Sequence, residues 1–392
     1  GIAGVGNQSG FGKRGLKTLG YYVCTSAISI LIGLTLVNLI KPGLTGGEPN
    51  PQIKDLIERN EEHYQKSVGD KLSSAGVAMD EKSTQSFSDV FKRMIPTNVF
   101  QAFSSNSQML ALITVSLLTG FGVLFISEGA RENLMGFFTA LNELMLLITR
   151  WIMLLAPIGV FGLVSATVAQ SGFALFGLLA KYFVVVLIAL AIHMFVVMPL
   201  ILKFVAGVNP LRHFKAMRNA LLTAFSTASS SGTLPVTLRG LQENVGVSNK
   251  VSSFVLPLGA TVNMDGTALY ECVAVLFISQ VLGLQLTFAE QLTVVILALL
   301  TSIGVAGVPS ASLVAIVIIV NNVLADKIGP GSATAVIGVL LAVDRLLDMS
   351  RTAVNVFSDS VGAVVIAKLE GETGLLEDPM HTAHEPLPDR TD

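Results

Sequence analysis

The chain has 392 residues, of which 52% are hydrophobic and only 13% are charged, and its mean hydropathy is +0.68. A soluble domain usually has about 25% charged residues, so this composition excludes an ordinary soluble protein and indicates a polytopic membrane protein. The net charge of −2 provides no basic field that would bind nucleic acid.

The first apolar run, about residues 19–40, is long enough to cross a bilayer and follows a basic stretch at Lys13, Arg14 and Lys17. Short basic loops favour the cytoplasm, so we expect this helix to run from the inside to the outside. Residues 41–94 form a long polar stretch, and alternation of the spans predicts that they are extracellular. Cys24 and Cys272 lie in apolar stretches, and we expect both to be buried without a disulfide.

Three further apolar regions follow, at about 97–127, 135–168 and 173–205. The first is interrupted by SSNSQ at 104–108, which predicts a broken helix. His193 is a lone histidine in the third region, and we expect it to be packed rather than to act as a ligand. A second basic cluster then predicts a return to the cytoplasm; it comprises Lys203, Arg212, His213, Lys215 and Arg218.

The rest of the chain alternates two kinds of apolar segment. Two are interrupted by small residues and proline: 214–245, broken at TASSSGTLP (227–235), and 288–325, broken at SIGVAGVPS (302–310). Two are helices with polar residues: 250–284, which contains ATVNMDGT (260–267), and 333–367. A broken hairpin followed by a polar helix, repeated once, is typical of transporters with inverted repeats.

The helix expected at 333–367 has one polar face. At about 100° per residue, its polar side chains fall within an arc of roughly 100°. They are Asp344, Asp348, Arg351, Thr352, Asn355 and Asp359. A charge at membrane depth costs on the order of 3 kcal/mol, so such side chains face a cavity or a partner. The alternative, a soluble amphipathic helix, conflicts with the composition.

The interruptions supply groups that bind ions. The N-terminus of a half-helix offers free N–H groups to an anion, so SSSGTLP predicts a cradle for a carboxylate. Freed carbonyls and carboxylates suit sodium, and Asn263, Asp265 and Asp359 would provide such oxygens. The alternatives are a surface turn for SSSGTLP and a loop between two shorter helices at 263–266.

Four motifs resemble the signatures of the glutamate/aspartate and dicarboxylate–cation symporter family, which includes the excitatory amino-acid transporters. They are SSSGTLPVT (229–237), LPLGATVNMDGTALY (256–270), SIGVAGVPS (302–310) and LDMSRTAVNVFSD (347–359). The resemblance implies an all-α polytopic fold with inverted repeats, two re-entrant helical hairpins, a homotrimer and an elevator-type movement. The family has eight membrane helices, and YYVCTS (21–26) resembles the third, so we expect that the first helix and part of the second lie upstream of this sequence.

The resemblance also implies a division of the chain. Residues 1–94 would be the truncated start, with the helix 19–40 and the loop 41–94. Residues 95–168 would be scaffold helices, 169–213 a transport-domain helix, 214–371 the transport core, and 372–392 a cytoplasmic tail.

The family's substrate site is implied at matching positions. Asp348 resembles the carboxylate that binds the substrate's α-amino group, helped by Thr352, and Arg351 resembles the clamp on the side-chain carboxylate. The other implied contacts are Asn355 with Ser229, Ser230 and Ser231 at the α-carboxylate, Thr267 at the side-chain carboxylate, and Val308 and Ser312 closing over the substrate. The additional arginine of the family is replaced by Ala228 or Met349, and Arg345 is a candidate substitute.

Three sodium sites are implied by the same resemblance. The first comprises Asp359, Asn355 and the carbonyls of Gly259 and Asn263. The second comprises the carbonyls of Thr261, Met264, Ser302, Ile303 and Val305. The third comprises Asp265 and Asn263 with Tyr22, Thr25 and Ser26.

Glu271 is an ionisable residue inside an apolar stretch, where burial disfavours the charged carboxylate. In the eukaryotic members of the family, a glutamate at the matching position is tied to proton cotransport and potassium countertransport. The alternative is a structural glutamate, held neutral or paired with Arg345.

These observations predict a sodium-coupled symporter of L-glutamate or L-aspartate in the plasma membrane, or in the inner membrane of a bacterium, with H⁺ and K⁺ as further candidate coupling ions. The alternatives within the family are a C4-dicarboxylate or neutral amino-acid symporter, but the first lacks a partner for an amine and the second lacks the arginine clamp. A passive channel does not require an aspartate beside an arginine. An intramembrane hydrolase, with a serine near Asp348, is a remote alternative, because no histidine or lysine lies near SSSGTLP in the sequence to act as a base. We therefore expect no enzymatic activity.

Overall fold

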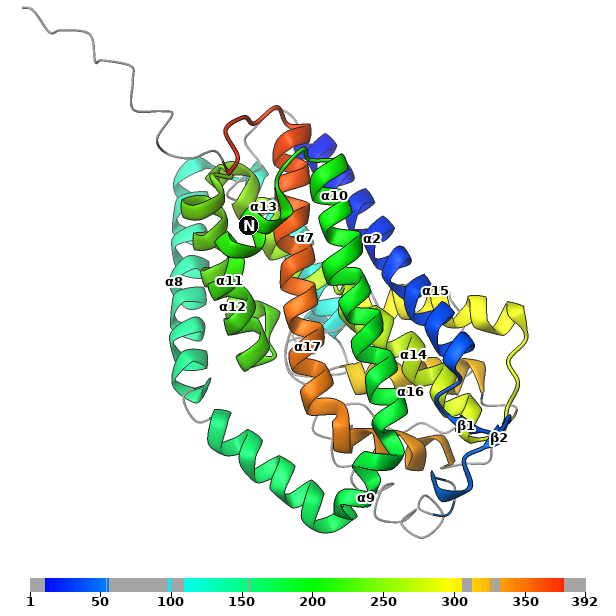
Figure 1. The fold of residues 1–392 in the computed structure, drawn as a ribbon. Helices are drawn as coiled ribbons and strands as arrows, with labels where there is room; N and C mark the ends of the chain where they lie inside the picture. Colours follow the sequence, from blue (N-terminus) through cyan, green and yellow to red (C-terminus); the bar gives the residue numbers. More distant parts are fainter. Residues whose placement is uncertain are drawn as a thin grey trace, which may run out of the picture.

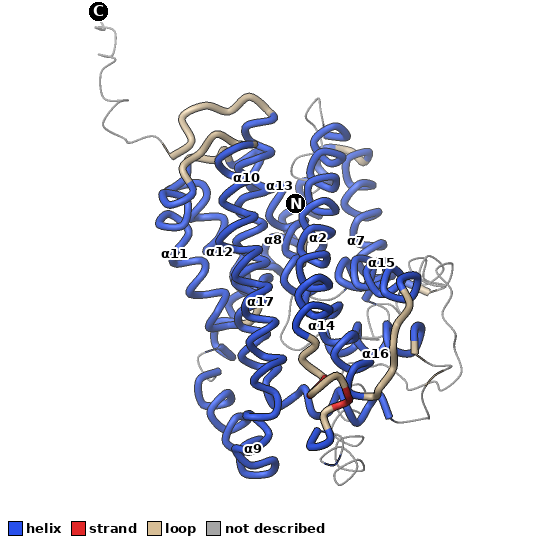
Figure 2. The backbone as a smooth tube through the Cα atoms, turned by 45° about the vertical axis from the view of Figure 1, so that its right-hand side comes forward, coloured by secondary structure: helices blue, strands red, loops and turns tan. Residues whose placement is uncertain are grey.

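The computed structural model describes residues 11–53, 55, 98–99, 109–153, 156–304, 312–324, 327 and 332–376. These residues are almost entirely helical (Figures 1 and 2). The first half contains α2 (Phe11–Ile40), α7 (Met109–Gly122), η2 (Val123–Phe125), α8 (Glu128–Met153), α9 (Ala156–Ile192), η3 (His193–Val197) and α10 (Met198–Phe204). The second half contains α11 (Pro210–Thr227), α12 (Ser230–Arg239), η4 (Gly240–Val245), α13 (Asn249–Val262), α14 (Asp265–Val281), α15 (Phe288–Gly304), α16 (Ser312–Val323) and α17 (Ser332–Leu369). Two short strands, β1 (Leu44–Thr45) and β2 (Glu48–Pro49), pair antiparallel after α2.

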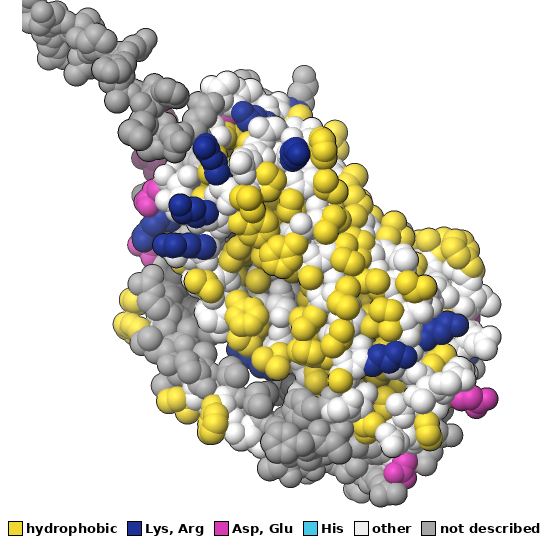
Figure 3. Space-filling model, in the orientation of Figure 1, with side chains coloured by type: hydrophobic (Ala, Val, Ile, Leu, Met, Phe, Trp, Pro, Cys, Tyr) yellow, Lys and Arg dark blue, Asp and Glu magenta, His cyan; other side chains and the backbone are white. Residues whose placement is uncertain are grey.

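Four segments of the described chain are long and apolar enough to cross a membrane: Arg14–Ile40, Gly177–Phe204, Asn249–Val281 and Val336–Leu369. The chain is therefore a multi-pass membrane protein. The last two segments are 89% buried within the protein, whereas the first two are 33% buried. The first pair thus surrounds the second, and its outer side chains form the apolar surface seen in Figure 3.

Helix α14 lies at the centre of the fold and packs against α2, α9, α15 and α17. The contact with α2 is close because Gly33 has no side chain: a Cβ there would lie 2.9 Å from Val273 Cγ2. Small residues allow this approach between membrane helices, where apolar burial alone does not drive association. On the other side, the ring of Tyr182 on α9 lies 4.5 Å from that of Phe277. The central helix is therefore held on several sides.

Several predicted boundaries are wrong. Helix α2 begins at residue 11 rather than 19, because its basic first turns remain helical. The expected single helix 250–284 is two helices, α13 and α14, separated at Asn263 and Met264. Helix α9 runs through the expected gap at 169–172, since one glycine costs a helix only about 1 kcal/mol, and it begins instead at Ala156, with Pro157 in its first turn. The expected break at 104–108 and most of the loop 41–94 lie outside the described residues.

The interrupted segment 214–245 consists of α11 and α12, which are separated by Ala228 and Ser229. Ala228 is in the left-handed conformation, with φ at 51°, and ends α11. The segment 288–325 consists of α15 and α16, and the residues between them, 305–311, lie outside the described residues. Whether both pairs re-enter the membrane stays a prediction.

Cys24 was expected to be buried but is exposed, because it lies on the outer face of α2.

The start of α2 and the end of α17 are joined by charged side chains. Glu370 Oε2 lies 3.0 Å from Arg14 Nη2, and its Oε1 lies 3.0 Å from Lys17 Nζ. Arg14 is buried, with only 2% of its surface exposed, whereas Lys17 is partly exposed. The hydrogen bond from Lys17, followed by that from Arg14, lowers the pKa of Glu370 below its usual value. This cluster fixes two helix ends that are far apart in the sequence.

We expect Glu370→Gln to destabilise the protein by about 2 kcal/mol, because it leaves the buried Arg14 guanidinium without its carboxylate. Since the folded-state pKa is lowered, the stabilisation is complete above the pKa of an unfolded glutamate. It disappears as the pH falls through the lowered value. Thermal unfolding in detergent at several pH values measures the difference. Glu243→Gln, at an exposed ion pair, is the control, and equal unfolding of the Glu370 variant and the unaltered protein at neutral pH would contradict the prediction.

Candidate functional site

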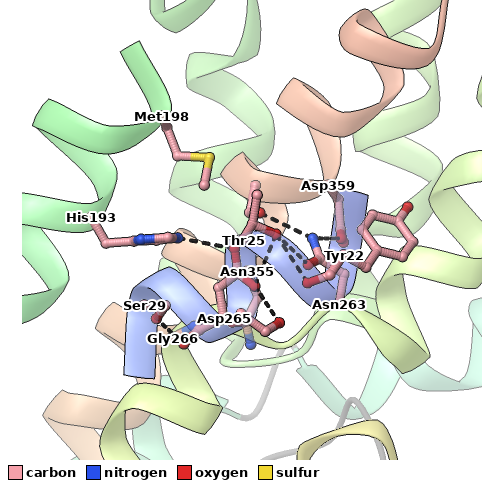
Figure 4. A network of polar contacts seen from close by, with 12 residues as sticks. Tyr22, Thr25, Ser29, His193, Met198, Asn263, Asp265, Gly266, Asn355 and Asp359 are labelled. Carbon is pink, nitrogen blue, oxygen red and sulfur yellow. Dashed lines mark hydrogen bonds and ion pairs between the residues drawn. The ribbon is translucent and has the colours of Figure 1, made fainter. Parts of the chain in front are cut away.

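The break between α13 and α14 places polar groups in the interior. Asn263 has φ and ψ of −98° and 82°, and Met264 has −113° and 58°, so neither residue is helical. Asn263, Met264 and Asp265 are buried. Their side chains and carbonyls lie between α2 and α17, whose polar residues surround the break (Figure 4). Irregular backbone at this depth is tolerated only where protein or a cavity satisfies it.

An unusual group of oxygens surrounds Thr25 on α2. Its Oγ1 lies 3.4 Å from Asn263 Oδ1, 3.4 Å from Asp265 Oδ1, and 3.2 Å from the carbonyls of Tyr21 and Tyr22. A hydroxyl has one proton, so it can donate to only one of these four acceptors. The remaining contacts bring oxygen next to oxygen in a buried place. A hard cation bound by carboxylate, amide, hydroxyl and carbonyl oxygens would satisfy such a group.

Asp265 is the most connected side chain at the break. Its Oδ1 accepts from Ser26 Oγ at 2.6 Å, and its Oδ2 accepts from Ser358 Oγ at 2.6 Å. His193 Nε2 lies 2.9 Å from the same Oδ2, and both residues are fully buried. His193 is packed inside the protein, as predicted, and the π-helical turn η3 in addition presents its ring to Asp265, a contact that the sequence analysis did not include. The signal for this contact with Asp265 was that His193 is an ionisable residue in an apolar span.

Asp359 lies on α17 beside the same break. Asn263 Nδ2 donates to Asp359 Oδ1 at 2.9 Å and contacts Ser358 Oγ at 3.0 Å. Gly259 makes this possible, since a Cβ there would lie 2.5 Å from Asp359 Oδ1. The hydroxyl of Tyr22, expected at the third sodium site, donates to the carbonyl of Val255 at 2.7 Å. Two carboxylates, Asp265 and Asp359, are thus joined through Asn263.

A second polar group lies farther along α17, around Arg351. Its Nη2 lies 2.8 Å from Asp348 Oδ1 and 3.2 Å from Asp344 Oδ1. The guanidinium also lies over the ring of Tyr270, 3.7 Å from its centre, and Tyr270 donates to Asp344 at 3.0 Å. Arg351 is fully buried, and its Nε and Nη1 have no hydrogen-bond partner in the described part of the chain. Arg345 is more distant from Asp348, at 3.9 Å.

Asn355 connects the two groups. Its Oδ1 accepts from the backbone N–H of Gly266 at 2.8 Å, and its Nδ2 donates to Thr267 Oγ1 at 3.1 Å. Thr352 donates to the carbonyl of Asp348 within α17. The polar face predicted for this helix therefore meets α14 through Asn355, Arg351 and Asp344, and meets the α13–α14 break through Asp359. Asp344 and Tyr270 had no role in the sequence-based site, although Asp344 had been placed on that face.

The serines of the first interrupted segment lie at the start of α12, which packs against α17. Ser229 caps the helix by accepting from Gly232 N at 3.1 Å, and Ser230 is buried beside it, followed by Ser231. Ser312 is buried at the start of α16, and its hydroxyl has no partner in the described chain. Val308 and Val305, expected at the substrate and at the second sodium site, lie outside the described residues.

The other carbonyls expected at the second sodium site come from two helix ends that pack together. Thr261 is in the last turn of α13, directly before the break at Met264. Ser302 and Ile303 are in the last turn of α15, which contacts α13. Carbonyls in the last turn of a helix lack intrahelical partners, so these ends offer oxygen ligands.

Glu271 lies on α14, one residue after Tyr270, and is fully buried. Its Oε2 accepts from Thr301 Oγ1 at 2.8 Å, and its Oε1 has no partner within the described residues. The alternative that Glu271 pairs with Arg345 is wrong, because Arg345 lies beside Asp348 instead. A buried carboxylate oxygen without a donor is costly, which is the usual condition for a group that exchanges a proton.

Comparison with known proteins identifies a family. The family model described as the sodium:dicarboxylate symporter family matches residues 1–369. The human excitatory amino acid transporter 3 is 35% identical over 388 residues, covering 91% of this chain and 72% of the relative. The proton/sodium-glutamate symport protein of Bacillus subtilis is 32% identical over 371 residues, covering 95% and 80%. The proton/glutamate-aspartate symporter of Escherichia coli is 32% identical over 370 residues, covering 94% and 79%.

Proposed function

Since this chain belongs to the sodium:dicarboxylate symporter family, and is a transporter rather than an enzyme, we propose that it is a sodium-coupled symporter of L-glutamate and L-aspartate. The observation that supports this proposal most is the buried pair of Asp348 and Arg351, 2.8 Å apart on one face of a membrane helix. The names of the relatives, which include glutamate and aspartate symporters, agree with it.

The substrate would exchange partners with this pair. Its ammonium would take the place of the guanidinium at Asp348, and its side-chain carboxylate would take the place of Asp348 at Arg351. Nε and Nη1 of Arg351 have no partner in the described part of the chain, and either one forms a parallel pair of donors with Nη2 once the substrate replaces Asp348 there. Asn355 and the serines 229–231 would bind the α-carboxylate, and Thr267 would contact the side-chain carboxylate. Ser312 with Val308 would cover the substrate. A dicarboxylate without an amine would leave Asp348 without a partner on the substrate. A neutral amino acid has no side-chain carboxylate and would leave Arg351 without one.

Sodium would enter as cotransported substrate at the oxygens around the α13–α14 break. The group formed by Thr25, Ser26, Asn263 and Asp265, with Tyr22 nearby, supports one site. Asp359 with Asn355 and the carbonyls of Gly259 and Asn263 supports another. The helix ends with Thr261, Met264, Ser302 and Ile303 support a third, together with Val305.

Uptake and exchange in liposomes test the proposal. We expect labelled L-aspartate and L-glutamate to accumulate only with an inward sodium gradient, and preloaded unlabelled substrate to accelerate entry, which a channel does not produce. A C4-dicarboxylate and a neutral amino acid serve as competitors. Efficient uptake of either one in place of the acidic amino acids would assign the chain to another substrate class.

Asp359→Asn should raise the sodium concentration for half-maximal uptake by roughly tenfold, because a carboxylate provides a full negative charge at the ion and an amide does not. Uptake is measured as a function of sodium at saturating substrate. Ser279→Ala on α14, away from the break, is the control, and an unaltered sodium curve for Asp359→Asn would remove this residue from the site.

Glu271→Gln should make net uptake insensitive to external pH and internal potassium, while exchange of substrate persists. The reason is that an amide cannot take up or release a proton at this buried position. Net uptake and exchange are measured in the same liposomes at several pH values, with and without internal potassium. If the unaltered protein shows neither dependence, Glu271 is structural and the carrier uses sodium alone.

The resemblance also leads us to propose a homotrimer in which the part from 214 to 371 moves against a scaffold that includes 95–168. Native mass spectrometry of the detergent-purified protein determines the number of subunits, and a monomer at all concentrations would exclude the trimer. Cross-links between α8 and α12, which belong to the two parts and are in contact, would distinguish a moving from a fixed arrangement.

A further inference from the structure

A groove lies on the outer surface where α10 ends and α11 begins. Its volume is about 700 Å³, and its lining includes Phe195, Pro199, Val208, Leu211 and Phe214. This volume falls within the range of about 300–1,000 Å³ that is typical of sites for small organic ligands. Apolar and aromatic side chains dominate the lining, so an aqueous metabolite is a poor match, whereas a hydrocarbon chain fits.

The groove has a rigid inner wall and an exposed outer edge. The ring of Phe214 stacks on Phe195 with centroids 5.6 Å apart, and on Phe357 of α17 with centroids 4.0 Å apart. Val208 is buried beneath, whereas Phe195 is 61% and Leu211 is 78% exposed. The exposed apolar edge belongs to the face that, in Figure 3, continues over α9 and α10. The groove is therefore open to the hydrocarbon of the bilayer.

One charged residue, Lys203, lines the groove. It lies one residue before the end of the apolar segment Gly177–Phe204, where a membrane helix reaches the lipid head groups. Its side chain is exposed, and no carboxylate within the described residues pairs with it. The loop after α10 lies at the same end as the start of α2 and the end of α17 (Figure 1), which the basic loops predict to be cytoplasmic.

We propose that this groove binds an anionic phospholipid, with one acyl chain against Phe195, Phe214 and Leu211 and the phosphate against Lys203. The apolar lining of the groove and the position of the lysine match the two parts of such a molecule. The cytoplasmic leaflet contains the anionic lipids, and basic pockets between helices on that side favour their head groups. The site is separate from the substrate and sodium groups, which lie inside the fold.

Lipid retention in detergent tests the proposal without any transport measurement. The full chain is incubated with phosphatidylglycerol or phosphatidylcholine, and native mass spectrometry counts the lipid that stays bound. We expect phosphatidylglycerol to be retained in preference to phosphatidylcholine. Lys203→Gln should reduce the retention of phosphatidylglycerol roughly fivefold, since one lysine near the head groups contributes about that factor, and should reduce that of phosphatidylcholine less, because its choline cation cancels the net charge.

Two further variants separate the acyl chain from the charge. Leu211→Ser should weaken retention of both lipids, because it removes an exposed apolar wall that the fold does not need. Lys250→Gln, an exposed lysine outside the groove, is the matched control and should change nothing. Equal retention of phosphatidylglycerol by the Lys203 variant and the unaltered protein would overturn the proposal. Displacement of the lipid by soluble glycerol phosphate would also overturn it, by showing that a free anion occupies the site.

Discussion

Replacing Arg351 with cysteine should abolish uptake of acidic amino acids and admit small neutral ones. The guanidinium is fully buried between Asp344, Asp348 and Tyr270, whereas Arg345, the other arginine near Asp348, lies 3.9 Å from that carboxylate. Loss of a buried charge-assisted contact costs roughly 3 kcal/mol or more, which is about a hundredfold in affinity. Competition of labelled aspartate uptake by aspartate, glutamate, serine and alanine measures the change.

Two controls accompany this variant. Arg351→Lys keeps the charge but loses the planar fork, so it should bind acidic substrates with intermediate affinity. Arg239→Cys removes an arginine that is 77% exposed on α12 and should leave uptake unchanged. Aspartate and glutamate affinities equal to those of the unaltered protein in Arg351→Cys would exclude Arg351 as the clamp.

Replacing Asp265 with asparagine should weaken the activation of uptake by sodium. This carboxylate accepts from Ser26 and Ser358, lies beside His193, and faces the oxygen group around Thr25. The amide loses the negative charge and directs an N–H₂ group toward partners that are themselves donors. We expect the sodium concentration for half-maximal uptake to rise at least tenfold. Most of this effect should appear as weaker sodium binding when the binding of radioactive sodium is measured directly.

Folding of this variant must be measured independently, because Asp265 also stabilises the break. Size-exclusion chromatography and thermal unfolding without sodium serve this purpose, and His193→Gln gives a milder change at the same carboxylate. Glu132→Gln, an exposed acidic residue on α8, is the charge-matched control. A correctly folded Asp265→Asn protein with normal sodium binding would exclude this residue as a sodium ligand.

The sequence predicted the helical membrane fold and the polar face of α17, because charges in an apolar segment must face a partner inside the protein. Arg351, Asp348 and Asn355 do lie on one buried face, toward α14. From the sequence, a single helix through Asn263 and Asp265 was favoured, and a gap between two helices was the less favoured alternative. Their small and polar neighbours are compatible with a continuous helix, and only packing against α2 and α17 decides between the two.

The role of His193 was missed for a similar reason. A histidine in an apolar span has no periodicity that indicates its partner, and Asp265 is 72 residues away in the sequence. The π-helical turn that directs the ring inward inserts one additional residue per turn, which hydropathy does not reveal.

The boundary between the third and fourth predicted spans was wrong because polar residues near 170 were interpreted as a loop, although α9 continues through them.

The π-helical turn at residues 193–197 has one further consequence. It directs His193 to Asp265 at one end, and its Phe195 forms part of the outer groove. Sodium beside Asp265 would lie next to His193, and a phospholipid in the groove would contact Phe195, so a shift of this turn would link the two binding equilibria thermodynamically. By reciprocity, the factor by which the lipid changes sodium affinity must equal the factor by which sodium changes lipid affinity. Sodium titrations in bilayers with and without phosphatidylglycerol, set beside lipid titrations at two sodium concentrations, would measure this factor from both directions.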